Sequence, residues 1–195
     1  MTGTGEGVQS VGPGRREQLL TAAREVLAAR GYERTTVSSI AGRAQVAQGT
    51  FYLYFPSKEA LPGALAEQLA AALGEAADRA SASSDALEEV VDALVRETWQ
   101  AAAEFRDVLL IANRGFELAG TWDEFVELTA AWREPLERLL RRFQADGQVS
   151  KALDPEMTAF VLRDVLDRSM KAKVLFGQDR YADATSTLVL RALAA

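Results

Sequence analysis

Helical spacing of apolar residues recurs along the chain, and strand patterns do not. The first run begins after Arg15 and stops before Gly31, where a left-handed helix cap costs least; its apolar members are Leu19, Leu20, Ala23, Val26 and Leu27. No stretch alternates between apolar and polar residues, as a strand with one buried face would. The pattern therefore predicts an all-α fold.

About nine helices are expected, and several have recognisable ends. The expected ranges are 15–30, 37–44, 48–55, 58–81, 85–103, 105–119, 122–145, 155–176 and 181–194. Asp154 and Pro155 supply an N-cap and a first-turn proline, and Gly177 is a natural stop. Pro62 lies past the first turn of its helix, so a bend or a restart is expected there, and Pro135 should kink the helix that it interrupts.

The chain contains no His and no Cys, which excludes most enzyme designs. Histidine-activated nucleophiles, imidazole ligands, thiolates and iron–sulfur sites are all impossible. A helical di-iron enzyme needs Glu-x-x-His pairs and is excluded as well. A carboxylate metal site or a Lys, Asp or Tyr catalyst stays open, but carboxylates such as Glu88, Glu89 and Asp92 are better explained as a solvated face. We expect a protein that is not an enzyme and binds no metal or cofactor.

Charge is distributed unevenly along the 195 residues. Residues 1–60 carry seven basic and five acidic side chains, whereas the rest carries 15 basic and 23 acidic ones. A mildly basic head on an acidic body suits a protein that touches a polyanion at one end. The longest apolar runs are far shorter than the roughly 20 residues of a membrane helix, and residues 1–14 hold five of the 14 glycines. We expect a cytoplasmic protein with a flexible segment at 1–14.

Two short helices near residue 45 have the anchors of a helix-turn-helix. Thr36 is a plausible N-cap for the first of them. The small Ala41 lets the two helices approach, and the expected mutual core is Ile40, Ala41, Ala44, Val46 and Phe51. This arrangement predicts a three-helix domain over residues 15–60 and a larger helical domain over 61–195.

The third helix divides its side chains between two faces. Phe51 and Phe55 lie one turn apart and can pack inward, while Thr50 and Tyr54 lie one turn apart on another face. Hydroxyl and amide groups on that second face suit contacts to phosphates and to base edges in a major groove. An equally weighted interpretation makes the tyrosines half-buried core residues with hydrated tips.

The stretch from Thr35 to Ala41, followed by the run from Ala44 to Leu61, closely resembles the N-terminal DNA-binding region of TetR/AcrR-type transcriptional regulators. The specific part is a threonine-bearing start of the second helix joined to Gly-Thr-Phe-Tyr-x-Tyr-Phe-x-Ser-Lys-Glu at residues 49–59. The resemblance covers about Arg15 to Leu61, and beyond it only helix count, length and the placement of Pro and Gly agree.

This resemblance implies a set of DNA contacts. The third helix would be the recognition helix, and its DNA-facing residues would be Gln48, Gly49, Thr50, Tyr52 and Tyr54. Thr36 and Ser38 at the start of the second helix, and Lys58 at the start of the fourth, would hold phosphates. Helix N-termini and lysines are good anion contacts that set register without reading sequence.

Two residues depart from the family pattern. Gln45 stands where the family usually has Gly, so a left-handed backbone there would cost roughly 1–2 kcal/mol, or the turn would be altered. Ala47 stands where Ser is usual, so the recognition helix would lack its side-chain cap, a loss of roughly 0.5–2 kcal/mol.

The resemblance also implies a homodimer with a small-molecule pocket in the larger domain. We expect the interface on the last two helices, where the apolar positions, equally consistent with intrachain core, include Phe160, Val161, Val165, Val174, Leu188, Val189 and Leu193. The expected pocket lies among the middle helices, where ordinary core is the other explanation for each residue. The candidates are Trp99, Phe105, Asn113, Arg114, Phe116, Trp122, Phe125 and Trp132.

These features predict a dimeric, sequence-specific DNA-binding regulator, and a repressor that a ligand releases from a palindromic operator. The ligand would favour a conformation in which the recognition helices are wrongly spaced. The alternative is a helical dimeric interaction protein whose DNA binding is degenerate, which the substitutions at Gln45 and Ala47 slightly favour.

Overall fold

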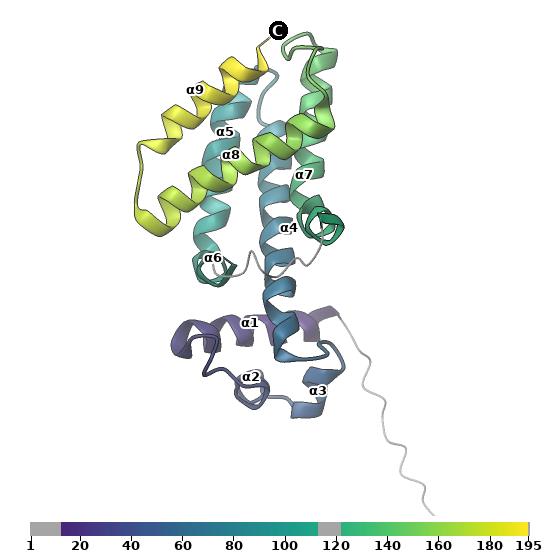
Figure 1. Cartoon of the computed structure of the whole chain (residues 1–195), viewed down its shortest axis with the longest axis vertical. Coiled ribbons are helices and arrows are strands. Elements are labelled where there is room, and N and C mark those ends of the chain that lie inside the picture. The colour runs from purple at the N-terminus through teal and green to yellow at the C-terminus, as the bar shows by residue number, and fades with distance from the viewer. Residues whose placement is uncertain (1–12, 113–121, 195) are drawn as a thin grey trace, which may run out of the picture. The chain divides into compact units, whose positions relative to one another are not determined.

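The computed structural model describes residues 13–112 and 122–194, which form nine α-helices and no strand (Figure 1). The predicted all-α fold with an N-terminal helix-turn-helix is confirmed. The chain divides into two compact units, Met1–Leu61 and Pro62–Ala195. Each unit is described by itself below.

The first unit contains α1 (Pro13–Arg30), α2 (Val37–Arg43), α3 (Gln48–Tyr52) and the 3-10 turn η1 (Lys58–Ala60). Its core is formed by side chains of α1, α2 and α3 and of the residues that follow α3. The fully or nearly buried apolar side chains include Leu19, Leu20, Ala23, Leu27, Ile40, Ala41, Ala44, Phe51, Phe55 and Leu61. Burial of each large side chain contributes about 1.5–3 kcal/mol, so this small unit has a core of its own.

The third helix is shorter than expected. The predicted range was 48–55, but α3 ends at Tyr52 and the chain continues through turn residues. The amide of Tyr54 donates to the carbonyl of Phe51 at 3.0 Å, which is the tighter spacing of a 3-10 turn. Phe55 is nevertheless 3% exposed, so the tightened turn still delivers it to the core.

The helix restarts close to Pro62. A bend or a restart was expected there from the sequence. The segment predicted to be one helix from Lys58 is η1 followed by α4 (Leu61–Ser81). Pro62 therefore falls in the first turn of α4, where its missing N–H has no intrahelical partner to lose.

The second unit consists of five further α-helices together with α4. They are α5 (Leu87–Glu104), α6 (Arg106–Ala112), α7 (Trp122–Ala145), α8 (Pro155–Phe176) and α9 (Tyr181–Leu193). In Figure 1, α8 runs diagonally across α5, and α9 turns back beside α5. The helix predicted for 105–119 is described only as far as Ala112.

The ends of α8 follow the predicted signals. Asp154 is the N-cap, and its carboxylate accepts from the amide of Met157 at 2.8 Å. Pro155 occupies the first turn, and Gly177 closes the helix with φ 67°, a left-handed conformation that glycine adopts without steric cost. The predicted range, 155–176, is confirmed.

A close approach joins α4 to α7 at Gly74. A Cβ atom built on Gly74 would lie 2.0 Å from the backbone oxygen of Ala131. Pro135 has no N–H to donate to that carbonyl, which lies four residues earlier in α7. The Ala131 carbonyl thus lacks its usual N–H partner within α7, and the Gly74 Cα that faces it carries no side chain. The helix α7 continues through Pro135.

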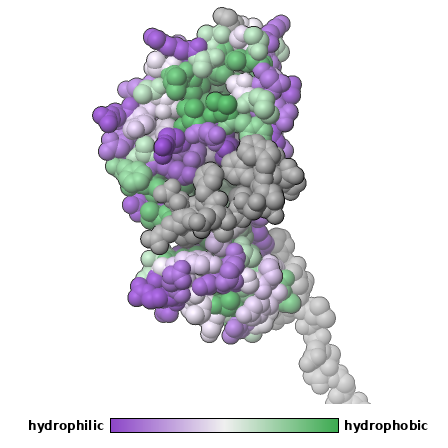
Figure 2. Space-filling model, in the orientation of Figure 1, coloured by the Kyte–Doolittle hydropathy of each residue, from purple (hydrophilic) through white to green (hydrophobic). Residues whose placement is uncertain are grey.

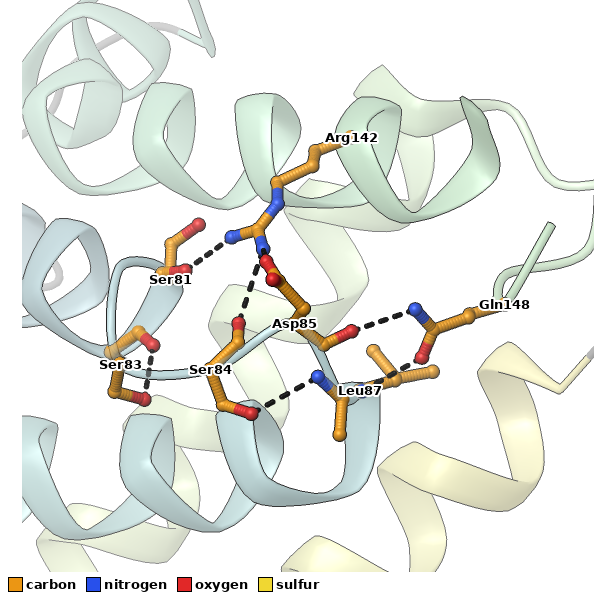
Figure 3. Close-up of polar contacts among 9 residues, drawn as sticks. Ser81, Ser83, Ser84, Asp85, Leu87, Arg142 and Gln148 are labelled. Carbon is orange, nitrogen blue, oxygen red and sulfur yellow. Dashed lines mark hydrogen bonds and ion pairs between the residues drawn. The ribbon is translucent and has the colours of Figure 1, made fainter. Parts of the chain in front are cut away.

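Two long polar side chains, one on α7 and one in the turn that follows it, hold the loop between α4 and α5 (Figure 3). Arg142 donates to the carbonyl of Ser84 at 3.1 Å and forms an ion pair with Asp85. The Gln148 amide donates to the carbonyl of Asp85 at 2.8 Å and accepts from the amide of Leu87 at 2.9 Å. Gln148 thereby supplies a hydrogen-bond acceptor to an amide at the start of α5. The N-cap residue of α5 makes no side-chain hydrogen bond of its own.

Replacing Gly74 with Ala should destabilise the second unit by about 1–2 kcal/mol, because overpacking against rigid backbone, at about 2–3 kcal/mol, outweighs the roughly 1 kcal/mol gain in helix propensity. Chemical denaturation of the full chain measures the change. Gly63→Ala in the same helix is the control, since open space surrounds Gly63, and it should be neutral or stabilising. Equal midpoints for the two variants would contradict the close approach.

Candidate nucleic-acid interface

A left-handed residue joins α2 to α3. Gln45 has φ 55° and is the one non-glycine residue with positive φ in the described residues, so the left-handed backbone is the outcome found, of the two that the sequence left open. The amide of Val46 donates back to the carbonyl of Ala41 at 3.0 Å. The side-chain amide of Gln18, on α1, donates to the carbonyl of Ala44 at 2.7 Å. These bonds hold the turn despite its unfavourable residue.

The starts of α2 and α3 differ. Thr36 caps α2: its Oγ1 accepts from the amide of Ser39 at 3.1 Å, and the Ser39 hydroxyl accepts from the amide of Thr36 at 3.1 Å. Ala47 caps α3 without any side-chain hydrogen bond, as predicted. The first amides of α3 are therefore left without a side-chain acceptor.

The two faces of α3 separate apolar from polar groups. Phe51 is fully buried and its ring centroid lies 5.4 Å from that of Phe55. Tyr52 and Leu53 are 51% and 68% exposed. Tyr52 and Leu53 are therefore accessible from solvent, on the side of the motif away from Phe51.

The predicted DNA-binding residues all have accessible surface. Thr36, Ser38, Gln48, Gly49 and Tyr52 are exposed; Thr50, Tyr54 and Lys58 are half-buried. Tyr54 thus combines the two interpretations of the tyrosines, a partly packed ring with accessible surface. The assignment of these eight residues to DNA contacts stays a prediction.

Lys58 is positioned by Tyr32, a residue that the sequence reasoning missed. Its Nζ donates to the carbonyl of Tyr32 at 3.3 Å and lies 4.5 Å from the centroid of the Tyr32 ring. Burial of the Tyr32 phenol, with Glu59 and Glu33 nearby, raises its pKa above the ordinary value. An ammonium has three donors, so these contacts orient Lys58 and leave it able to bind a phosphate.

Glu59 adds a negative charge beside Lys58. Hydrogen bonds from the Ser57 side chain and from its own backbone amide lower the pKa of Glu59 against an opposing effect of desolvation, and the Lys58 charge lowers it further to a lesser extent. Glu59 is therefore ionised at neutral pH and tempers the positive potential of this edge. The attraction for a polyanion must come from short-range contacts more than from net charge.

Of the eight predicted pocket residues, three can be placed. Trp99 lines a cleft, Phe105 is the half-buried C-cap of α5, and Trp132 is 3% exposed and belongs to the core. Asn113, Arg114 and Phe116 lie outside the described residues, as do the side chains of Trp122 and Phe125.

The cleft lies between α5, α8 and α9 and extends to the start of α6. Its volume is about 630 Å³, within the range of small-molecule sites. Val95, Trp99 and Ala103 line it from α5, Val174 from α8 and Ala182 from α9.

An apolar face runs along α8 and α9. Figure 2 shows hydrophobic surface gathered over these helices. Met157, Val161 and Leu188 are 54%, 64% and 57% exposed. Among the predicted interface positions, Val189 and Leu193 are 4% and 2% exposed and belong to the intrachain core. The others, Phe160, Val165 and Val174, are half-buried.

Within residues 13–112 and 122–194, no group of three or more acidic side chains could hold a metal ion. In the same part of the chain, no helix has the length and apolar character to span a membrane.

Residues 19–65 match the family described as bacterial regulatory proteins, tetR family. The chain is 28% identical over 157 residues to the uncharacterised HTH-type transcriptional regulator YvdT of Bacillus subtilis (strain 168), which covers 80% of each chain. The matched family segment spans α2, α3 and η1, the elements that form the candidate interface.

Two solved structures extend the similarity over the second unit. The fatty acid degradation regulator FadR of Bacillus halodurans superposes with a TM-score of 0.71 at 24% identity, covering 93% of this chain and 97% of that one. The FadR repressor of Thermus thermophilus, in complex with lauroyl-CoA, superposes with a TM-score of 0.69 at 26% identity, covering 92% and 95%.

Replacing Gln45 with Gly should stabilise the first unit by about 0.5–1 kcal/mol. Relief of a strain of roughly 1–2 kcal/mol is partly offset by about 0.5–1 kcal/mol of added entropy in the unfolded chain. Amide hydrogen exchange at Ile40 and Phe55 in the full chain should slow about two- to five-fold. Gln45→Ala keeps the strain and should bring no gain; equal protection from both substitutions would contradict the strained turn.

Proposed function

We propose that this chain is a homodimeric transcriptional repressor of the TetR family, which residues 19–65 match, and that a small molecule releases it from a palindromic operator. The observation that carries the proposal is the division of α3: Phe51 is buried, while Gln48, Gly49 and Tyr52 are exposed. A short helix anchored by one face can present the other to the major groove. Such a regulator acts in the cytoplasm. It binds DNA and catalyses no reaction.

The exposed groups divide into two kinds of DNA contact. The Gln48 amide, the Thr50 hydroxyl and methyl, and the phenols of Tyr52 and Tyr54 suit base edges and adjacent phosphates. The hydroxyls of Thr36 and Ser38 and the ammonium of Lys58 suit phosphates alone. The first group would choose the sequence, and the second would fix the register.

Dimerisation completes the proposed mechanism, because one short helix reads too few bases. Two recognition helices about 34–36 Å apart would read two half-sites on one face of the duplex. The exposed apolar side chains Met157, Val161 and Leu188 on α8 and α9 support an interface there. Val189 and Leu193, buried within the chain, are not part of that proposed surface.

Release from DNA would follow a population shift. A ligand that changes occupancy from nearly full to nearly empty needs about 5.5 kcal/mol of preference for the non-binding conformation. The chain passes from η1 into α4 at Leu61 with no intervening linker, so α4 is the proposed lever. The lauroyl-CoA bound to the Thermus thermophilus relative supports an effector with an apolar part.

A second candidate is a helical dimeric interaction protein with degenerate DNA binding. The left-handed Gln45 and the uncapped start of α3 favour it, because both make the recognition helix less stable locally. The two candidates differ in one measurable property: the repressor binds one DNA sequence in preference to others, and the interaction protein does not.

Selection from random duplexes should return a two-fold symmetric site. Gln48→Ala should cost about 1–3 kcal/mol on that site and relax the preference at one position per half-site. Lys58→Ala should weaken binding to all sequences and lower the slope of log affinity against log salt by about 0.9 per protomer. Shift assays at several salt concentrations measure both effects.

Lys151→Ala is the control for this experiment, because Lys151 is an exposed lysine of the second unit. It should leave affinity, preference and salt slope unchanged. A selection that enriches no sequence, with salt slopes alike for Lys58→Ala and Lys151→Ala, would favour the interaction protein.

A further inference from the structure

The side of α8 that faces away from the core carries a continuous stripe of residues. The buried side chains of α8 share one side of the helix and include Ala159, Leu162, Leu166 and Met170. The opposite side carries positions that are spaced alternately by four and three residues and are called the outer stripe below: Met157, Val161, Asp164, Arg168, Lys171 and Leu175. Lys171 and Leu175 are half-buried, and the other four are exposed. This spacing is typical of a helix that packs along a second helix.

The outer stripe is apolar at its ends and charged in its middle. Met157 and Val161 lie in its first half and Leu175 at its end, whereas a helix face that meets only water is polar throughout. Leu188, on the neighbouring α9, is 57% exposed and continues the apolar surface. Charged residues within such a stripe reduce the stability of helix pairing, but they specify its register.

The outer stripe is symmetric about residue 166. Asp164 and Arg168 each lie two residues from it, and Met157 and Leu175 each lie nine residues from it. Two copies of α8 that pack antiparallel around a two-fold axis at this point place each member of a pair opposite the other. An acid then meets a base twice, and an apolar side chain meets an apolar one twice.

Val161 and Lys171 form the third symmetric pair, each five residues from residue 166. The Lys171 ammonium donates to the carboxylate of Asp167 at 2.7 Å. Its charge is therefore already paired at the side of the stripe, and its aliphatic stem can cover Val161 of the second copy.

Asp164 and Arg168 are both able to reach a second chain. Asp164 forms an ion pair with Arg163, but its side chain is still 68% exposed, and a carboxylate can accept about four hydrogen bonds. In the part of the chain that the structure describes, the Arg168 side chain is in no hydrogen bond or ion pair, although Asp164 is one turn away.

Alternative registers of the antiparallel pair are unfavourable. A slip of one helical turn in one direction places Arg168 opposite Arg168 of the second copy. The same slip in the other direction places Asp164 opposite Asp164. Because like charges that meet in an interface oppose binding, the charge order permits one register and disfavours its two neighbours.

We propose that the outer stripe of α8 packs antiparallel against the same stripe of a second copy of this chain, with Asp164 of each copy paired with Arg168 of the other. The inference rests on the homodimer of the proposed function and adds what selects its partner and register. A helical surface with another charge order would place like charges opposite each other. The two reciprocal pairs therefore favour a second copy of this chain over other helical partners.

Sedimentation equilibrium of the full chain tests the reciprocal pairs through Arg168→Asp. This variant carries carboxylates at both central positions and keeps the ion pair between Arg163 and Asp164. Its dimer dissociation constant should rise at least about 100-fold, because like charges now meet twice. The rise should shrink as salt is added, since salt screens charge repulsion, whereas a purely structural defect would persist. Lys151→Asp makes the same charge change at an exposed position outside α8 and should leave the constant unchanged.

A mixing experiment separates charge pairing from damage to the helix. Asp164→Arg carries two arginines at the central positions and should also dimerise weakly by itself. An equimolar mixture of Asp164→Arg with Arg168→Asp restores an acid opposite a base at every contact, so it should form a heterodimer about as tightly as the wild type. The double variant Asp164→Arg, Arg168→Asp should form a homodimer again. Circular dichroism confirms that each variant is folded, and Arg168→Asp decides the inference by itself if Asp164→Arg is not.

Either of two results would overturn the inference: an Arg168→Asp chain that dimerises as tightly as Lys151→Asp at low salt, or folded single variants whose mixture dimerises no better than its components. Operator affinity of the same samples separates this inference from the proposed function. Wild-type dimers that obey the charge rules but prefer no operator refute the repressor and leave the inference standing. Dimers that bind operator and are insensitive to Arg168→Asp refute the inference alone, and a monomeric wild type refutes the inference together with the proposed homodimer.

Discussion

The direction in which α3 leaves α2 depends on the left-handed backbone of Gln45. Because the turn is fixed there, Phe51 points into the core and Gln48, Gly49 and Tyr52 remain outside. Local preference opposes this geometry, since Gln is a poor residue for positive φ and Ala47 offers no cap. Tertiary contacts outweigh it: the Gln18 bond to Ala44 and the burial of Phe51 hold the motif together. The exposed face of α3 is thus held in place by the core of the first unit rather than by the local stability of the helix.

The second unit depends on a comparable arrangement of backbone. Gly74 and Pro135 together allow α4 and α7 to meet without side chains between them. Arg142 then secures the loop that follows α4 through Ser84 and Asp85. These contacts fix one side of the bundle, and an open cleft lies between α5, α8 and α9.

Local signals predicted the elements well, and distant contacts were not predictable from them. The ends of α8 follow from Asp154 and Gly177 because caps act within one turn. The early end of α3 at Tyr52 was missed, since helical spacing of Phe51 and Phe55 is also compatible with a tightened turn. The contact between Lys58 and Tyr32 spans 26 residues, and no pattern along the chain signals it. Apolar periodicity likewise could not tell that Leu193 faces inward and Leu188 outward.

Hydrogen–deuterium exchange of the full chain, with and without the duplex recovered by selection, tests the central claim most directly. The account predicts slower exchange in residues 36–40 and 48–58 with that duplex, little change in these segments with a shuffled duplex, and none at the amides of α7. Protection confined to the second unit, or identical protection by the two duplexes, would contradict a sequence-reading surface built on α3.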